Sequence, residues 1–253
     1  MSTTLSMQGI RGGVGTSTVL AALGHALNRL EQRVLLIDMC PENLLGLHFN
    51  LPADEELGWA RAEIEGKDWR DCAYTPFKDL ALLPYGRILP EQTWEIERRL
   101  APWPGISREQ LIEYASEFDW LLFDLPQGLP MHVAAVEGDG GCDLMLRVVN
   151  VDPGCHVRLQ RAGWDGAFPR VLVNRYDASI QLQRNLMQLW LQDHEQRLLP
   201  MAVHEDAAVP EALAMKMPVG MHAADSLAGA DLEGLALWCQ AEIGRLERAG
   251  ELS

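Results

Sequence analysis

Short apolar runs recur along the chain, and most end in Asp, Asn or Pro before an amphipathic stretch begins. The runs are continuously apolar rather than alternating, which is typical of strands that are buried on both faces of a parallel sheet. The predicted strands cover residues 5–10, 33–38, 80–84, 120–124, 144–151, 170–174 and 198–203.

Amphipathic segments between these runs predict helices. Residues 18–30 carry Val19, Leu23 and Leu27 at helical spacing, and Ser107 with Gln110 forms a capping box for a helix over 108–118. Further helices are predicted over 180–192 and 232–247. The alternation of strand and helix predicts a doubly wound α/β fold with a mostly parallel sheet and helices on both faces. We expect one nucleotide-binding domain over residues 1–253, with an irregular peripheral stretch at about 48–104.

A glycine-rich segment, residues 9–18, joins the first predicted strand to the first predicted helix. Glycines let backbone N–H groups surround an anion, and the N-terminus of the helix adds partial positive charge. This junction therefore predicts a phosphate-binding loop.

The loop spacing also fits a second class of protein, the NAD(P)-dependent short-chain dehydrogenases. Gly9, Gly13 and Gly15 match a dinucleotide loop, and Asp38 ends the second strand, where an acid would bind ribose. The chemistry of these enzymes needs Tyr and Lys four residues apart on a helix. Only Tyr74 and Lys78 have this spacing, and Pro76 between them disfavours a helix. The dehydrogenase stays open as a remote alternative.

The segment from Arg11 to Thr18, RGGVGTST, resembles the deviant Walker A motif of the MinD/ParA family of P-loop NTPases, K-G-G-x-G-K-[ST]. Asp38 and Asp124 each end an apolar run and resemble the family's switch I and switch II aspartates, and Asp124 opens a D-x-P sequence. Asn174 and the Leu199-Pro200 pair resemble the residues that contact adenine.

This resemblance implies an ATP and Mg²⁺ site and a homodimer formed across the nucleotide. The implied magnesium ligands are Ser17, Asp38 and Asp124, and the two aspartates are also the implied catalytic residues. The implied nucleotide-binding residues are Arg11, Gly12, Gly13, Val14, Gly15, Thr16, Ser17, Thr18, Asn174 and Pro200.

Three positions depart from the pattern of an active MinD/ParA ATPase. Thr16 replaces the lysine that reaches the phosphates, Arg11 replaces the signature lysine that crosses to the partner, and Cys40 replaces the second switch I aspartate. Phosphoryl transfer depends on positioning and on neutralising charge, so these changes weaken catalysis more than binding. We expect ATP and Mg²⁺ binding with slow or absent hydrolysis. The alternative is an active ATPase that positions a secretion complex.

Further phrases resemble the MinD/ParA-type proteins of bacterial cellulose synthesis operons. They lie at residues 8–16, 40–45, 58–62, 68–71, 149–152, 189–192 and 197–201, mostly outside the nucleotide motifs. This resemblance implies a role in cellulose synthesis, secretion and biofilm formation. The implied partners are a small accessory protein of the BcsR type and the cellulose synthase complex.

The charge balance narrows the choice of partners. The chain has 21 Lys plus Arg against 36 Asp plus Glu, a formal net charge of −15 with neutral histidines. Nucleic acid and anionic lipid attract clustered Lys and Arg, so we expect neither nucleic-acid binding nor direct membrane insertion. The five cysteines contain no C-x-x-C pair and no signal peptide is evident, which favours the cytoplasm. Recruitment to the inner membrane or the cell pole through protein partners is left open.

Overall fold

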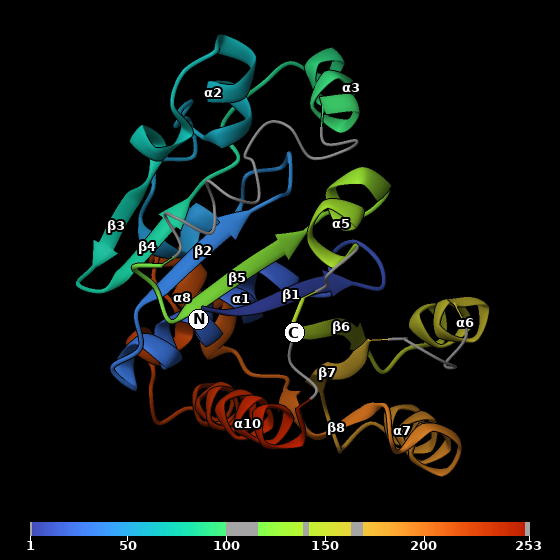
Figure 1. Ribbon diagram of the computed structural model, residues 1–253. Coiled ribbons are helices and arrows are strands. Elements are labelled where there is room, and N and C mark those ends of the chain that lie inside the picture. Colours follow the sequence, from blue (N-terminus) through green and yellow to red (C-terminus); the bar gives the residue numbers. More distant parts are fainter. Residues whose placement is uncertain (1, 100–115, 139–141, 163–168, 251–253) are drawn as a thin grey trace.

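The computed structural model describes residues 2–99, 116–138, 142–162 and 169–250 (Figure 1). Its strands are β1 (Thr3–Gly9), β2 (Val34–Asp38), β3 (Tyr74–Phe77), β4 (Leu80–Leu83), β5 (Trp120–Leu125), β6 (Leu144–Asn150), β7 (Arg170–Tyr176) and β8 (Leu198–His204). The α-helices within these ranges are α1 (Thr16–Arg29), α2 (Trp59–Glu65), α3 (Pro90–Arg99), α5 (Pro130–Glu137), α6 (Pro153–Ala162), α7 (Gln181–His194), α8 (Ala208–Ala214), α9 (Val219–His222) and α10 (Leu227–Ala249). Two short 3-10 helices, η1 (Leu45–Phe49) and η2 (Trp69–Cys72), follow β2 and α2.

The strands form one eight-stranded sheet in the order β3-β4-β2-β5-β1-β6-β7-β8. All neighbours are parallel except β3 and β4, which pair antiparallel at one edge. The predicted doubly wound, mostly parallel α/β fold is therefore confirmed. The register places Asp38 beside Asp124 and Asn150 beside Asn174, so the carboxyl ends of the strands bring polar residues together.

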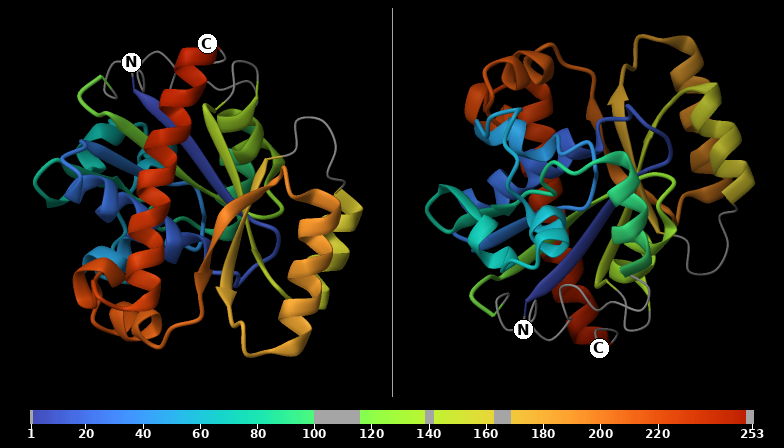
Figure 2. Two further views of the ribbon diagram at one scale, coloured as in Figure 1. Left: turned by 90° about the horizontal axis from the view of Figure 1, so that it is seen from below. Right: turned by 90° about the horizontal axis from the view of Figure 1, so that it is seen from above.

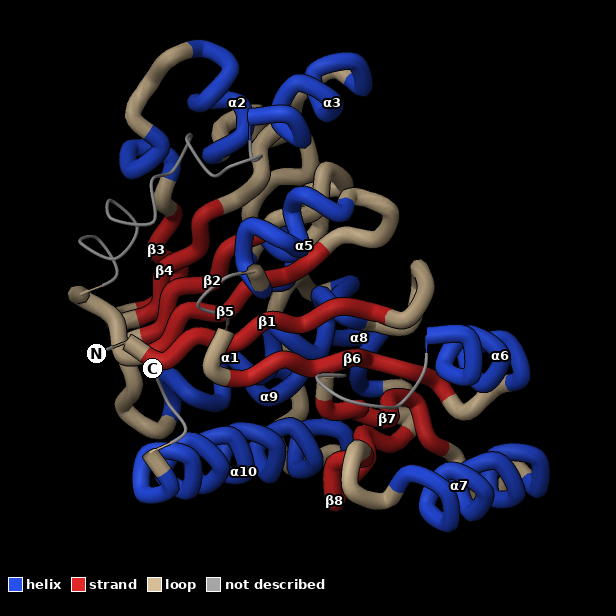
Figure 3. The backbone as a smooth tube through the Cα atoms, turned by 45° about the vertical axis from the view of Figure 1, so that its right-hand side comes forward, coloured by secondary structure: helices blue, strands red, loops and turns tan. Residues whose placement is uncertain are grey.

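Helices cover both faces of this sheet (Figure 3). On one face, α1 packs against α10 and α9, and α10 also contacts β8. Figure 2 shows α10 running across this face from one end to the other. On the other face, α2, α3 and α5 enclose a second apolar cluster that includes Leu35, Ile37, Trp59, Phe123 and Ile96. The two clusters hold the strand ends in place from both sides.

The described part of the stretch at 48–104, residues 48–99, contains regular secondary structure. It contains α2, η2, α3 and the strands β3 and β4, which extend the main sheet. Pro76 lies within β3, and an edge strand tolerates proline because its outer side needs no ladder hydrogen bond. The helix predicted over 108–118 falls almost entirely on residues 100–115, which lie outside the described part of the chain.

No helix in the described ranges combines the length and apolarity that crossing a bilayer requires. The longest, α10, buries Leu232, Leu235, Cys239 and Ile243 against the protein. Its apolar face is therefore used in the core.

Candidate functional site

The glycine-rich loop runs from the end of β1 into the first turn of α1. Gly13 and Gly15 have φ angles of 77° and 91°, a left-handed backbone that favours glycine. Val14 between them is buried and anchors the loop to the core. A Cβ added to Gly9 would lie 2.6 Å from Val14 Cγ2 and 2.7 Å from Thr16 Oγ1, so the loop folds closely over this residue. Backbone N–H groups and the N-terminus of a 14-residue helix thus gather at one point, as a phosphate site requires.

Asp38 and Asp124 lie next to this loop, at the ends of the paired strands β2 and β5. Both are buried. The Asp38 carboxylate accepts hydrogen bonds from the backbone N–H of Cys40 at 2.9 Å and of Leu45 at 3.1 Å. Trp59 Nε1 donates to the Asp38 backbone oxygen at 2.7 Å, which ties α2 to the end of β2. In contrast, Asp124 Oδ2 is buried and has no hydrogen-bond partner.

The two carboxyls change each other's ionisation. Burial raises the pKa of Asp38 well above its ordinary range, and the charge of Asp124 adds to the effect. Burial also raises the pKa of Asp124 to about 7, although Ser17 and Cys40 hydrogen bonds act in the opposite direction. The half-buried Cys40 lies beside them, and desolvation raises the pKa of its thiol as well. A pair of buried acids with an unpartnered oxygen is electrostatically incomplete without a cation.

These residues fit a magnesium ion. Mg²⁺ prefers oxygen ligands, and the unpartnered Asp124 Oδ2 is a free donor beside Asp38. Ser17 stands in the first turn of α1, close enough for its hydroxyl to lower the pKa of Asp124. The predicted metal residues Ser17, Asp38 and Asp124 are therefore brought together by the fold. Thr16 and Thr18 flank Ser17 in the same turn.

A pocket of about 310 Å³ lies beside the loop. Its lining residues are Gly15, Thr18, Val19, Asn174, Arg175, Val203, His204, Glu205, Asp206, Val209, Pro210, Leu213 and Leu232. Asn174 Nδ2 donates to the backbone oxygen of Val14 at 2.7 Å, and Arg175 Nη1 donates to that of Gly13 at 3.3 Å. The predicted base-binding asparagine thus also supports the phosphate loop.

Pro200, which the resemblance implies as a nucleotide-binding residue, does not line this pocket. It is exposed in the edge strand β8, four residues before the strand ends at His204. The carboxyl end of β8 reaches the pocket, and residues 203–206 line it. Asp206 shapes this loop because its carboxylate accepts from the backbone N–H of Ala208 and of Ala228.

Arg11 extends from the glycine-rich loop toward α6. Its Nη2 lies 2.8 Å from Asp152 Oδ2, and Asp152 also accepts from the backbone N–H of Cys155 in the first turn of α6. The hydrogen bond to Asp152 raises the pKa of Arg11. In this state Arg11 is paired within its own chain, a contact that the sequence did not indicate.

Other site residues also escaped the sequence analysis. Gln8 Nε2 donates to Pro126 O at 2.7 Å and Gln127 Nε2 donates to Gly9 O, so β1 and the segment after Asp124 hold each other. The only indication in the sequence was that Gln8 precedes the glycine-rich segment and Gln127 follows the D-x-P sequence. Nothing local marked Trp59 or Arg175, whose roles depend on contacts between distant segments.

The Tyr and Lys of the dehydrogenase alternative do not lie on a helix. Tyr74 begins β3, and Lys78 lies in the turn after it with an exposed side chain. The helical geometry that this chemistry needs is absent at these two residues.

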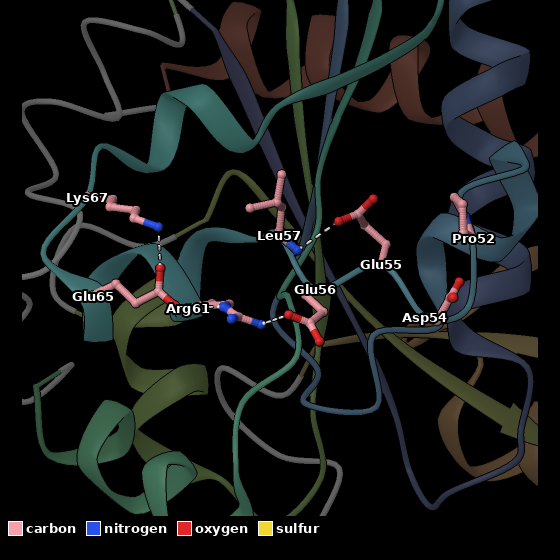
Figure 4. Close-up of a pocket in the computed structure, with 8 residues that line it drawn as sticks. All are labelled: Pro52, Asp54, Glu55, Glu56, Leu57, Arg61, Glu65 and Lys67. Carbon is pink, nitrogen blue, oxygen red and sulfur yellow. Dashed lines mark hydrogen bonds and ion pairs between the residues drawn. The ribbon is translucent and has the colours of Figure 1, made fainter.

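A second pocket, of about 430 Å³, lies between the segment 52–57 and α2 (Figure 4). Arg61 pairs with Glu56 at 2.5 Å and with Glu65 at 2.8 Å, and Lys67 pairs with Glu65 at 2.6 Å. The two basic side chains of this pocket, Arg61 and Lys67, are therefore already paired with acids. Two further acids, Asp54 and Glu55, also line the pocket. This lining disfavours a phosphate ligand.

Solved structures with a similar fold include proteins with a bound nucleotide and magnesium. MinD from Pyrococcus horikoshii OT3, complexed with Mg-ADP, has a TM-score of 0.73 and 20% identity over 93% of this chain and 95% of that one. MinD in the MinC:MinD complex of Aquifex aeolicus has a TM-score of 0.71, with 18% identity over 95% and 96% of the two chains. Cobyrinic acid a,c-diamide synthase of Mycobacterium smegmatis, with a bound ATP analogue and magnesium, has a TM-score of 0.69, with 17% identity over 100% and 98%. At these identities the likeness shows the fold.

Sequence relatives are more informative. The family model for the cellulose biosynthesis protein BcsQ matches residues 1–240. The BcsQ proteins of Escherichia coli K12 and Salmonella typhi are 41% identical over 237 residues and 40% identical over 241 residues, covering 93% of each chain. This match extends over the glycine-rich loop, Asp38, Asp124 and the pocket beside the loop, and the chain belongs to the BcsQ family of cellulose biosynthesis proteins.

Proposed function

We propose that this protein is an ATP- and magnesium-binding switch that works as a homodimer and supports cellulose synthesis through contacts with the synthase machinery. The observation that carries the proposal is the unpartnered, buried Asp124 Oδ2 beside Asp38, next to a glycine loop at a helix N-terminus. Bound magnesium would supply charge neutralisation to the phosphates and to the two acids.

The residues of this chain support binding more than hydrolysis. Loop N–H groups and the dipole of α1 attract phosphate without any lysine. Thr16 offers a hydroxyl where active relatives of the MinD/ParA type place a cation, and Cys40 offers a thiol where they place a water-orienting carboxylate. We propose that hydrolysis is slow or absent, so that bound ATP holds a conformation rather than driving a cycle.

Proteins are the favoured partners because the net charge of −15 disfavours DNA and anionic lipid. Membership of the BcsQ family supports the cellulose synthase complex and a small accessory protein of the BcsR type as these partners. The same contacts would recruit a cytoplasmic protein to the inner membrane or to the cell pole.

We expect Mg-ATP to raise the melting temperature of the purified protein, whereas NAD and NADP leave it unchanged. At a ligand concentration about 100 times the Kd, stabilisation is about 2.7 kcal/mol, or roughly 5–10 °C for a chain of this size. Gly15→Ala should abolish the shift, because a Cβ at Gly15 would lie 2.6 Å from Asn174 Nδ2 and its φ is 91°.

Gly244→Ala is the matched control, since Gly244 lies in α10 outside the loop and a Cβ there comes no closer than 3.4 Å, to Arg248 Nη1. It should keep most of the Mg-ATP shift. Equal shifts in both variants would contradict the proposed loop site. Phosphate release at the rate of an ordinary ATPase, abolished by Asp38→Ala, would instead favour the active ATPase.

The dimer depends on where Arg11 points. We expect Arg11→Ala to weaken ATP-dependent dimerisation, because in the proposed dimer Arg11 leaves Asp152 and reaches the nucleotide of the partner. Mass measurement by light scattering, with and without Mg-ATP, checks this. Arg11→Lys should restore part of the dimer because it keeps the charge. An unchanged dimer mass in Arg11→Ala would exclude the role of Arg11 across the interface.

A further inference from the structure

The thiol of Cys40 lies beside the two buried carboxylates. Among the described residues, one ligand atom each from Asp38, Cys40 and Asp124 lies within 4.8 Å of the other two. The Cys40 Sγ–H now donates to the backbone oxygen of Asp124 at 3.6 Å. Two carboxylate oxygens and one thiol sulfur are therefore close enough to bind one cation.

A second observation indicates that this cluster is built for a cation. Asp124 Oδ2 is buried without a hydrogen-bond partner, and Asp124 as a whole is 1% exposed. Each Asp38 oxygen accepts one backbone N–H and keeps a second lone pair. In the described part of the chain, no Lys or Arg forms an ion pair with either carboxylate.

We propose that Asp38, Cys40 and Asp124 form a binding site for a thiophilic divalent cation, such as Zn²⁺ or Co²⁺, that fills in the absence of nucleotide. The Cys40 thiol releases its proton to water, a metal–sulfur bond forms, and a water molecule completes four-coordination. No oxidation or reduction takes place. The cation also neutralises the two facing acids.

The sulfur atom determines the selectivity of this site. Mg²⁺ takes oxygen ligands in octahedral geometry, whereas Zn²⁺ and Co²⁺ accept thiolate together with carboxylate. An aspartate in place of Cys40 would give three carboxylates and no thiolate donor. With Cys40 as a ligand, the site favours Zn²⁺ or Co²⁺ over Mg²⁺. Asp38 and Asp124 are the same residues that the proposed function assigns to magnesium. The proposal does not depend on ATP binding.

Titration of the nucleotide-free, full-length protein with Co²⁺ tests the site. We expect one equivalent to produce a thiolate-to-cobalt charge-transfer band, which Zn²⁺ removes by competition and excess Mg²⁺ does not. Cys40→Ser should abolish the band, and Asp124→Asn should weaken Co²⁺ binding by about tenfold or more. Cys72→Ser is the control, since Cys72 lies outside the cluster, and it should keep the band.

Two outcomes would overturn the proposal: no charge-transfer band in the parent protein, or an equal band in Cys40→Ser. Circular dichroism and thermal unfolding of Cys40→Ser show whether the variant is folded. The Mg-ATP shift, measured on the same samples, separates the two proposals. A protein that binds Mg-ATP but not Co²⁺ refutes only the thiophilic site, and the reverse result refutes only the proposed nucleotide function.

Discussion

Asp124→Asn is expected to raise the melting temperature of the protein without metal or nucleotide, by an amount that grows as the pH rises from about 5 to about 8. Burial raises the pKa of Asp124 from 3.8 to about 7 in the folded state. A raised pKa means that the protonated form stabilises the fold, so this contribution is complete below pH 3.8 and is lost as the pH rises through about 7. Each pKa unit corresponds to about 1.4 kcal/mol, which makes the loss at pH 8 on the order of 4 kcal/mol.

Asparagine at position 124 removes this loss of stability, because it has nearly the same shape as aspartate and carries no charge beside Asp38. Thermal unfolding of both proteins across the pH range measures the effect. The same substitution should abolish the Mg-ATP shift, since the magnesium ligand is gone. Asp124→Asn should thus lose the proposed Mg-ATP binding and gain thermal stability. This is expected where two acids lie close together to bind a ligand, because their repulsion destabilises the protein without it.

Asp206→Asn is a control in which the expected change in stability has the opposite sign. Backbone N–H groups of Ala208 and Ala228 lower the pKa of Asp206, so its charged form stabilises the fold above its ordinary pKa and this stabilisation is lost as the pH falls. Asp206→Asn should therefore destabilise the protein at pH 8 and less so under acidic conditions. If both variants followed the same pH trend, the burial of Asp124 would not be the cause.

The combined substitution Thr16→Lys and Cys40→Asp is expected to increase ATP hydrolysis by roughly 100-fold, the size of effect that one well-placed charged or hydrogen-bonding group has in other enzymes. Lysine at position 16 would supply a cation to the phosphates from the first turn of α1. Aspartate at position 40 would orient water next to Asp38. Phosphate release under saturating Mg-ATP measures the rate.

Each single substitution should give a smaller increase, because positioning of water and stabilisation of charge act together in phosphoryl transfer. Adding Asp38→Ala to the double variant should abolish the gain. A double variant that binds Mg-ATP but hydrolyses no faster would show that Thr16 and Cys40 are not what limits the reaction. Cys72→Asp, outside the site, controls for an added acid.

The buried strands and the glycine loop with its neighbouring aspartates could be predicted from the sequence. The buried strands were identified because strands covered on both faces must be apolar throughout. The glycine loop was identified from its glycines at a strand-to-helix junction. Asp38 and Asp124 were identified because each ends an apolar run and resembles an aspartate of the MinD/ParA family. Their placement together in the fold depends on the strand order, which puts β2 beside β5.

The elements missed from sequence depend on packing. Helix α5 lacks a clear apolar stripe, and its start is held by Glu97 of α3, which accepts from the backbone N–H of Met131 and contacts His132. The strand β3 contains a proline and exists because β4 offers it an edge. Tertiary contacts can override weak local preferences in this way.

Local patterns were thus sufficient for the fold class and the glycine-rich loop, because strand burial and glycine geometry are visible in the residue order. The resemblance to the MinD/ParA family added the pair of acids. The tertiary structure alone decided that Arg11 pairs with Asp152, that residues 203–206 rather than Pro200 line the pocket, and that Asp124 Oδ2 lacks a partner. These features depend on distances between segments far apart in the chain, and such distances are set only when the helices pack on the sheet.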